Sequence, residues 1–172
     1  FVPYNISPIQ QAIQAGHAAL EYALAYADAE FFQEFVKVHK TWVILNGGTT
    51  NDQRDFDGVA QGTLNQIGDQ LNDNNIPFSF FCEPDLNNAL TALCFICDER
   101  VFNRKDYPDL LDFLLEKIPV QDEDSYTIAV VNGGKTEVLK EKFPEYYKEW
   151  IRLIGGMKNV FLRELIRDKK LA

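Results

Sequence analysis

An alanine-rich segment near the start of the chain carries polar side chains at helical spacing. Four of them recur at steps of four, three and four residues: Gln10, Gln14, His17 and Glu21. This spacing places them on one side of a helix. Amide and imidazole groups on a helix can orient a substrate carbonyl or a water molecule, and the Ala and Gly residues around Gly16 would let a ligand approach closely. The segment is therefore a candidate site, and the alternative is a solvated polar stripe with a structural histidine.

The helix that carries these residues is predicted to begin at Ser7 and to run to about Ala27. Ser7 is a favoured N-cap, Pro8 fits a first helical turn, and a strand end is expected just before them. Four aliphatic residues recur at steps compatible with one apolar face: Ile9, Ile13, Leu20 and Leu24. We expect this face to pack on the core.

The rest of the chain alternates between strand and helix patterns. After a short amphipathic segment at 30–38, strands are expected at 41–45, 76–83 and 91–102, and helices at 57–75 and 107–118. The Asn-Gly-Gly sequence at 46–48 predicts a turn, and residues 49–58 and 83–89 predict loops. We therefore predict an α/β fold of three α/β/α layers, in which a small mixed sheet has helices on both faces.

The last third of the chain is expected to form an extension of this fold. An acidic turn, a strand at 126–134 and helices over 135–156 and 157–170 follow the core in sequence. We assign residues 1–118 to an α/β core and residues 119–172 to a C-terminal extension packed on it.

The segment 129–136, AVVNGGKT, partly matches a phosphate-binding loop. A true P-loop presents several flexible residues after its strand. Here Ala129, Val130 and Val131 fall in the predicted strand, so we interpret the segment as a strand–turn–helix junction and not as a nucleotide site.

The formal net charge of −9 is unevenly distributed. Residues 1–98 hold 12 acidic and 3 basic side chains, whereas residues 99–172 hold 14 of each. Within 150–172, six basic side chains outnumber two acidic ones. A polyanion would bind this tail most readily, which makes Arg152, Lys158 and Arg163 candidate substrate contacts.

Three cysteines in strand-like segments predict reduced core thiols and no disulfide framework. Cys94 and Cys97 form a C-x-x-C, but a three-residue step along a strand points the side chains to opposite faces, and a second zinc-binding pair is missing. We expect no metal and no cofactor. The apolar runs are shorter than the roughly 20 residues that span a bilayer, and no signal-peptide pattern is found. We expect a cytoplasmic protein without membrane contact.

The stretch Gln14-Ala15-Gly16-His17-Ala18-Ala19 resembles the Gln-x-(Ala/Gly/Cys)-His-Ala-Ala helix of the type II peptidyl-tRNA hydrolases. The order of later elements is also similar, including a proline-containing strand, here Asn75-Ile76-Pro77-Phe78. The resemblance covers roughly residues 1–102. It implies a hydrolase that cleaves the ester between a peptide and tRNA with an activated water and without a metal.

The same resemblance implies roles for individual residues. The family's Arg-Asp-Ala-Gly loop is replaced by Cys82-Glu83-Pro84-Asp85, so Glu83 or Asp85 would be the base or water-orienting carboxylate. His17 and Gln14 would position groups or transfer protons, and Thr91 would donate a hydroxyl hydrogen bond. Gln10 and Gly16 would contact substrate. The alternative for Glu83 and Asp85 is a turn capped by acidic residues around Pro84.

This sequence departs from the family in its charge. The family's lysines before the Gln are missing, and no basic residue precedes Lys37. The basic segment 152–170 would supply tRNA contacts if it folded back, and otherwise it is a solvated amphipathic helix. Two other functions stay open: a non-catalytic scaffold that binds a protein or small ligand, and a hydrolase of another acyl ester. Monomer and homodimer are both compatible with the sequence.

Overall fold

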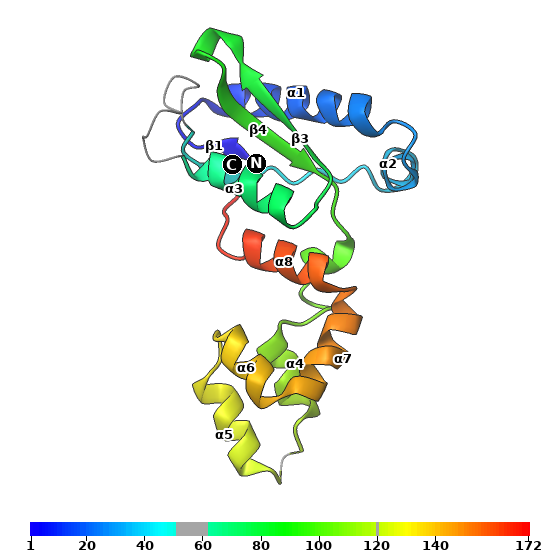
Figure 1. The fold of residues 1–172 in the computed structure, drawn as a ribbon, viewed down its shortest axis with the longest axis vertical. Coiled ribbons are helices and arrows are strands. Elements are labelled where there is room, and N and C mark those ends of the chain that lie inside the picture. Colours follow the sequence, from blue (N-terminus) through cyan, green and yellow to red (C-terminus); the bar gives the residue numbers. More distant parts are fainter. Residues whose placement is uncertain (51–61, 120) are drawn as a thin grey trace. The chain divides into compact units, whose positions relative to one another are not determined.

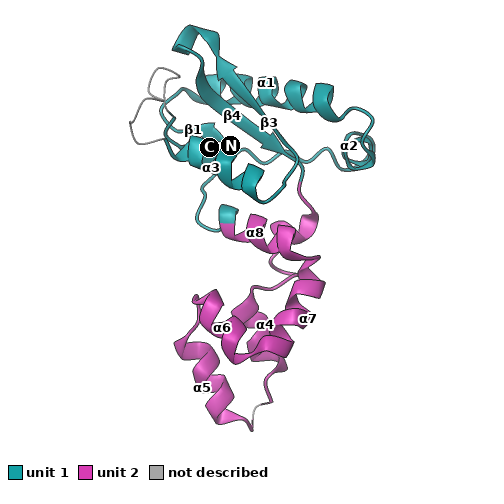
Figure 2. Ribbon diagram, in the orientation of Figure 1, with its two compact units in different colours: residues 1–96, 165–172 teal, residues 97–164 magenta. Residues whose placement is uncertain are grey.

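The computed structural model describes residues 1–50, 62–119 and 121–172. Contacts within the chain divide it into two compact units (Figure 2): unit 1 comprises residues 1–96 and 165–172, and unit 2 comprises residues 97–164. The division therefore falls after Ile96, whereas we expected it after residue 118. Residues 165–172 belong to unit 1, whereas we assigned them to a C-terminal extension packed on the core.

Unit 1 is a mixed α/β structure. Its strands are β1 (Val2–Pro3), β2 (Asn46–Gly48), β3 (Phe78–Glu83) and β4 (Ala89–Phe95). Strand β1 pairs parallel with β2, and β3 pairs antiparallel with β4. Two backbone hydrogen bonds between Phe1 and Leu93, of 2.8 and 2.9 Å, connect the two pairs. The predicted α/β class is therefore confirmed.

The helices of unit 1 are α1 (Pro8–Tyr26), α2 (Glu30–Glu34) and α3 (Thr63–Asp73), and a π-helical turn, η1 (Phe35–His39), follows α2. In Figure 1, α1 runs along the β3–β4 hairpin. Ala92 of β4 packs with Ala18 of α1, whereas the next residue, Leu93, lies beside Gly68 of α3. Both helices thus pack on β4, and they contact successive residues of that strand.

Helix α1 has the predicted bounds, but its buried face is not the predicted one. The Ser7 cap is confirmed, because the backbone nitrogen of Gln10 donates to Ser7 Oγ. The predicted core face is wrong, since all four of its aliphatic residues are exposed: Ile9, Ile13, Leu20 and Leu24. The buried residues are Gln11, Gln14, Ala18 and Tyr22. Small Ala18 lets the helix approach the sheet, and the two buried amides find hydrogen-bond partners.

The predicted strand at 41–45 is also wrong, because β2 is formed by the Asn-Gly-Gly segment that we interpreted as a turn. A Cβ on Gly47 would lie 2.5 Å from Leu64 Cδ1 and 3.2 Å from Phe1 Cβ, so the strand fits between α3 and β1 because it has no side chain there. The predicted loop 49–58 and the start of the predicted helix at 57–75 lie largely in 51–61, outside the described residues. Strand β4 ends at Phe95 and not at residue 102, because Asp98 caps a 3-10 turn, η4 (Glu99–Val101).

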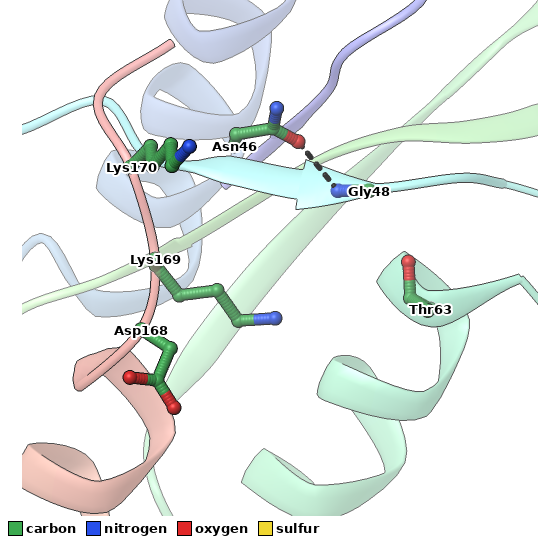
Figure 3. Close-up of a pocket in the computed structure, with 6 residues that line it drawn as sticks. All are labelled: Asn46, Gly48, Thr63, Asp168, Lys169 and Lys170. Atoms are coloured by element: carbon green, nitrogen blue, oxygen red, sulfur yellow. Dashed lines mark hydrogen bonds between the residues drawn. The ribbon is translucent and has the colours of Figure 1, made fainter.

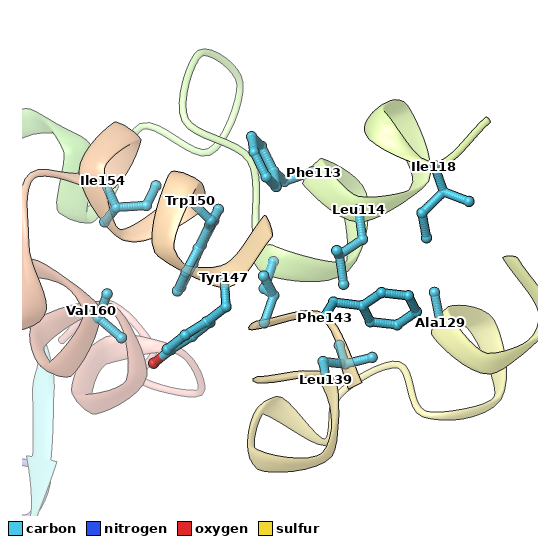
Figure 4. Close-up of a cluster of buried hydrophobic side chains, with 11 residues drawn as sticks. Phe113, Leu114, Ile118, Ala129, Leu139, Phe143, Tyr147, Trp150, Ile154 and Val160 are labelled. Carbon is cyan, nitrogen blue, oxygen red and sulfur yellow. The ribbon is translucent and has the colours of Figure 1, made fainter. Parts of the chain in front are cut away.

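The described part of unit 2 is helical. Its helices are α4 (Leu110–Lys117), α5 (Glu123–Val131), α6 (Thr136–Lys142), α7 (Pro144–Ile154) and α8 (Met157–Ile166), the last of which continues into unit 1. Their buried faces meet in an apolar core that includes Leu114, Leu139 and Trp150 (Figure 4). The predicted helix over 107–118 is confirmed for residues 110–117. The predicted helical material over 135–156 forms the two helices α6 and α7, and that over 157–170 is helical to Ile166.

The extra strand predicted at 126–134 is wrong, because these residues belong to α5 and the turn after it. Asp122 caps the helix by accepting from the backbone nitrogen of Ser125 at 3.1 Å, and acidic residues in the first turn suit the helix dipole. The segment 129–136 therefore joins two helices and is not the strand–turn–helix junction we expected. A P-loop follows a strand, so this arrangement also speaks against a nucleotide site.

No helix in the described ranges combines the length and the apolar character that a membrane span requires.

Candidate functional site

Three of the predicted site residues are joined by hydrogen bonds in unit 1. Gln14 Nε2 of α1 donates to Glu83 Oε2 at the end of β3, at 2.6 Å. Thr91 Oγ1 of β4 donates to Gln14 Oε1, also at 2.6 Å. Because both ends of the Gln14 amide are engaged, its orientation is fixed. We call this hydrogen-bonded chain of Thr91, Gln14 and Glu83 the carboxylate relay.

A β-bulge brings Thr91 into the relay. The β3–β4 register shifts between Phe81 and Cys82, whose partners are Ala92 and Leu90, so Thr91 is the extra residue. A bulge turns two successive side chains toward the same face of a sheet. Thr91 and Ala92 consequently both reach α1, where regular alternation would have pointed Thr91 away.

The relay runs from the protein interior to solvent. Thr91 is fully buried, Gln14 is buried, and Glu83 is half-buried. The second carboxylate oxygen of Glu83 accepts weakly from the backbone nitrogen of Asp85, at 3.5 Å, where the 3-10 turn η3 (Pro84–Leu86) begins. Glu83 therefore caps the turn around Pro84, which was the alternative to a catalytic role for this residue. It also accepts a hydrogen bond from Gln14. A reactant could reach Glu83, whereas Thr91 could act only through Gln14.

His17 and Phe81 flank the relay. The His17 ring is exposed and stacks on Phe81, with ring centroids 4.4 Å apart and planes inclined by 20°. Phe81 lies on β3, two residues before Glu83. The space beside Gly16 is open, because a Cβ built there would meet no atom within 4 Å. The imidazole is therefore held by an aromatic contact and remains accessible to a ligand.

Two other predicted residues lie at the margins of this site. Asp85 is exposed on the 3-10 turn, and only its backbone nitrogen contacts Glu83. Gln10 is exposed and completes the capping box, because its Oε1 accepts from the backbone nitrogen of Ser7 at 3.0 Å. Gln10 thus has a structural role at the start of α1.

The prediction that Arg163 contacts substrate is wrong. Its side chain is 1% exposed, and it donates to the carbonyls of Arg100 and Tyr107 at 2.6 and 2.9 Å and to Asp109 Oδ1 at 2.7 Å. A buried guanidinium needs such partners to offset its desolvation. Arg152 and Lys158 are exposed, and both belong to unit 2.

Sequence reasoning missed the ion cluster around Arg163. Asp109 accepts from both Arg104 and Arg163. Burial alone would raise the pKa of Asp109, but the hydrogen bonds and positive charges of the two arginines outweigh burial and lower it. The Asp-Leu-Leu sequence at 109–111 resembles an ordinary helix start, so nothing in it marks this role.

The cysteines are free thiols. Burial raises the pKa of all three, and that of Cys97 rises to about 11 because of burial and the nearby charge of Asp98. Their sulfurs are therefore poor nucleophiles at neutral pH. Among the described residues, no three His, Cys, Asp or Glu side chains gather as metal ligands would.

A shallow depression lies elsewhere on unit 1, between β2, the start of α3 and residues 168–170 (Figure 3). Figure 3 shows the Lys169 side chain extending toward this space, with Asp168 beside it. The Thr63 hydroxyl at its edge donates to the carbonyl of Gly47 at 2.8 Å and accepts from the backbone nitrogen of Thr49 at 2.9 Å. These contacts join α3 to β2, so we assign the depression a structural origin.

Comparisons of the chain with protein-family models, with curated proteins and with solved structures found no match. The geometry of the carboxylate relay is therefore the main basis for a functional proposal.

Proposed function

We propose that this protein is a hydrolase similar to the type II peptidyl-tRNA hydrolases, cleaving the ester bond of peptidyl-tRNA or a related acyl ester with an activated water. The observation that carries the proposal is the contact of Gln14 with Glu83, 69 residues apart in the chain, at 2.6 Å. Thr91 supports this contact from a third element. Three of the residues to which the family resemblance gives roles, Gln14, Glu83 and Thr91, are thus joined by hydrogen bonds.

The packing of unit 1 is compatible with the fold of that family. Ala92 faces α1, and Leu93, the next residue of β4, lies beside α3. Because successive residues of a strand point to opposite faces, this contact pattern supports a sheet with a helix on each face. We accordingly propose the three-layer arrangement for unit 1.

In the proposed reaction, a water molecule beside Glu83 gives a proton to the carboxylate while its oxygen attacks the ester carbonyl carbon. The bond between that carbon and the ribose oxygen then breaks, and the departing oxygen takes the proton from Glu83. The products are a carboxylic acid and a free hydroxyl. Gln14 holds one oxygen of Glu83. The other oxygen accepts only weakly from the backbone nitrogen of Asp85, at 3.5 Å, and in the proposal it is the one that faces the water.

The flanking residues have separate proposed roles. His17 lies on the exposed side of α1, where it can donate to or accept from the reacting groups as the negative charge develops on the carbonyl oxygen. Thr91 is a positioning residue, because its buried hydroxyl reaches only Gln14 and the carbonyl of Phe81. It fixes the amide orientation that directs Nε2 toward Glu83.

The test is release of labelled N-acyl-amino acid from N-acyl-aminoacyl-tRNA at low salt. We expect Glu83→Gln to lower the rate about 10²- to 10⁴-fold, the range for loss of a general base. The matched control is Glu21→Gln, which removes an exposed carboxylate from α1, the helix that carries Gln14 and His17, and should leave the rate unchanged. Asp85→Asn tests the alternative base, and His17→Ala tests the flanking imidazole.

Failure of the folded wild-type protein to release product from this substrate and from simple aminoacyl esters would overturn the hydrolase proposal. A loss in Asp85→Asn that matches or exceeds the loss in Glu83→Gln would instead transfer the base role to Asp85. Equal losses in Glu83→Gln and Glu21→Gln would indicate a general effect of negative charge and no specific chemistry.

A second candidate function is a non-catalytic module that binds a protein or small ligand on the same scaffold. The observation that favours it is charge: residues 1–98 hold 12 acidic and 3 basic side chains, and Arg163 is buried. Proteins that hold RNA need basic surface. Fluorescence anisotropy with labelled tRNA separates the two, because the module should show no binding even at low salt.

A further inference from the structure

The formally charged side chains on the elements that build the carboxylate relay are all acidic. In α1 and in residues 78–95, which supply the relay and its flanking rings, they are Glu21, Glu83 and Asp85. None of the ion pairs formed between described residues includes any of the three. The relay therefore ends in a negative charge that is not paired with a basic side chain of the described residues.

Two lysines of unit 1 follow α2, away from the relay. Lys37 belongs to η1 and Lys40 ends it. The aromatic residues of α2 pack on tyrosines at the C-terminal end of α1. That end is twelve residues beyond Gln14, about 18 Å along the helix axis. Exposed charges at this distance are largely screened, because the Debye length is about 8 Å at physiological ionic strength.

The other three basic residues described in unit 1 lie in the segment that returns along β2: Arg167, Lys169 and Lys170. The backbone of Lys170 pairs with Asn46 of β2. Strand β1 pairs with β2, and Phe1 is hydrogen-bonded to Leu93, so β1 and β4 lie between β2 and β3. Lys170 is thus four strand spacings from β3, about 19 Å. The charge at the relay is therefore set by Glu83 and Asp85.

We propose that the substrate of this site is an aminoacyl ester with a free α-ammonium group on an uncharged alcohol, and not a nucleic-acid ester. This inference rests on the proposed ester hydrolysis and names its substrate class. The α-nitrogen of such an ester is about 2.5 Å from the carbonyl carbon, since one Cα joins them. A water held by Glu83 attacks that carbon, so the ammonium group comes to lie beside the carboxylates.

Asp85 is within reach of the same group. Its backbone nitrogen is 3.5 Å from Glu83 Oε1, and bond lengths limit its carboxyl carbon to about 4 Å from that nitrogen. The two carboxylates are therefore within about 8 Å of each other in any rotamer of Asp85. Asp85 is exposed, so a substrate can approach between them.

The ammonium group also supplies a charge that the site needs. Negative charge develops on the carbonyl oxygen during attack, and nearby carboxylates oppose it. A positive charge on the substrate itself offsets this effect, whereas the phosphates of tRNA would add to it. The ammonium group is not consumed: water adds to the carbonyl carbon, the bond to the alcohol oxygen breaks, and that oxygen takes the proton from Glu83.

The test compares kcat/KM for glycine ethyl ester and N-acetylglycine ethyl ester, measured by ethanol release. The assay is run at about pH 6.5, below the α-amino pKa of about 8, and each value is divided by the rate constant of the same ester in buffer. We expect the wild type to prefer the unblocked ester about 2- to 25-fold, the range for two exposed charge pairs.

Asp85→Asn should lower this preference about two- to fivefold, the range for one such pair. If Asp85 were instead the general base, the variant would slow both esters alike and keep the preference. The matched control is Asp28→Asn, which removes an exposed carboxylate beyond the C-terminal end of α1 and should leave the preference unchanged. Circular dichroism verifies that both variants fold.

Equal normalised values for the two esters would overturn the inference and leave the hydrolase proposal standing. A preference for N-acetylglycine ethyl ester, or faster release from N-acyl-aminoacyl-tRNA than from glycine ethyl ester, would do the same. An unchanged preference in Asp85→Asn, or an equal change in Asp28→Asn, would overturn the ammonium contact. Failure of the folded wild type to hydrolyse any of the three esters would instead overturn the hydrolase proposal itself.

Discussion

The carboxylate of Asp109 balances a guanidinium that solvent cannot reach. Arg163 is 1% exposed, and its other hydrogen bonds go to backbone carbonyls, which carry no formal charge. Without Asp109, a buried positive charge would keep only Arg163's carbonyl partners. Breaking a buried ion pair by removing one partner costs several kcal/mol for this reason.

We expect Asp109→Asn to lower the free energy of unfolding by about 2–4 kcal/mol at neutral pH. The folded-state pKa of Asp109 is lowered, so its contribution is present above the unfolded pKa of about 4 and is lost as the pH falls through the folded value. Wild type should therefore lose more stability on acidification below about pH 4 than Asp109→Asn does. Urea unfolding at a series of pH values measures this.

The control for that experiment is Asp112→Asn, which removes an exposed carboxylate from the first turn of α4. It should change the stability by less than about 0.5 kcal/mol. If the free energy of unfolding of Asp109→Asn fell with pH as steeply as that of the wild type, Asp109 would not be the carboxylate that stabilises Arg163.

At the level of single residues, the sequence indicated the three members of the carboxylate relay but not the hydrogen bonds that join them. The helical spacing of polar residues indicates Gln14, and the family resemblance indicates Glu83 and Thr91; Gln14 is hydrogen-bonded to both. The bulge that turns Thr91 toward α1 depends on a register shift, which no local pattern marks. For Arg163, an amphipathic basic helix gives no sign of which arginine bonds to carbonyls and which faces water.

At the level of elements, strand β2 and helix α3 meet through glycines. A Cβ on Gly62, at the N-cap of α3, would lie 2.6 Å from the backbone oxygen of Thr49 and 2.7 Å from Thr50 Cα. These are backbone atoms, so the clash cannot be relieved by a rotamer change. The close approach allows Leu64 to donate its backbone N–H to the oxygen of Thr49 at 2.8 Å.

We expect Gly62→Ala to lower the free energy of unfolding by about 1–3 kcal/mol, since the added methyl group must displace backbone. The matched control is Gly68→Ala in the same helix, whose new methyl would make an ordinary 3.6 Å contact with Leu93. That change should be neutral or stabilise by up to about 1 kcal/mol through helix propensity. Urea unfolding midpoints of the two variants compare them, and equal midpoints would contradict the steric argument.

Helices with clear N-caps could be predicted from the sequence. The buried face of a helix and the positions of short strands could not. Ser7 and Pro8 define the start of α1, but its aliphatic residues were assigned to the core although they are exposed. Helix α5 contains the β-branched run Thr127, Ile128, Val130 and Val131, which is typical of a strand. The segment is nevertheless helical, because Asp122 caps its start and Ala129 packs in the apolar core of unit 2. These interactions outweigh the β-strand propensity of its side chains.

At the level of the whole molecule, unit 2 is an insertion within the sequence of unit 1. The chain leaves unit 1 after Ile96 and returns at Leu165. The returning segment binds the strand edge by backbone contacts: Asn46 N donates to Lys170 O at 2.9 Å, and Ala172 N donates to Ile44 O at 3.0 Å. Leu45 and Leu171 form an antiparallel bridge between them.

We expect removal of residues 170–172 to raise the amide exchange rate of Asn46 about tenfold or more, because the amide loses its hydrogen-bond acceptor. Amides of α4 and α7 in unit 2 should keep their rates, which makes them the internal control. Hydrogen–deuterium exchange with mass spectrometry measures both. Equal acceleration in the two units would show that the segment stabilises the chain as a whole.

The insertion also has a consequence for synthesis on the ribosome. The edge of β2 emerges early, but the segment that pairs with it is translated only after all of residues 97–164. At roughly 5–20 residues per second, translation from Asn46 to Lys170 takes about 6–25 seconds. An open strand edge can pair with a neighbouring chain. Nascent chains on one messenger RNA are therefore exposed to mispairing at Leu45 and Asn46 until unit 2 has been translated.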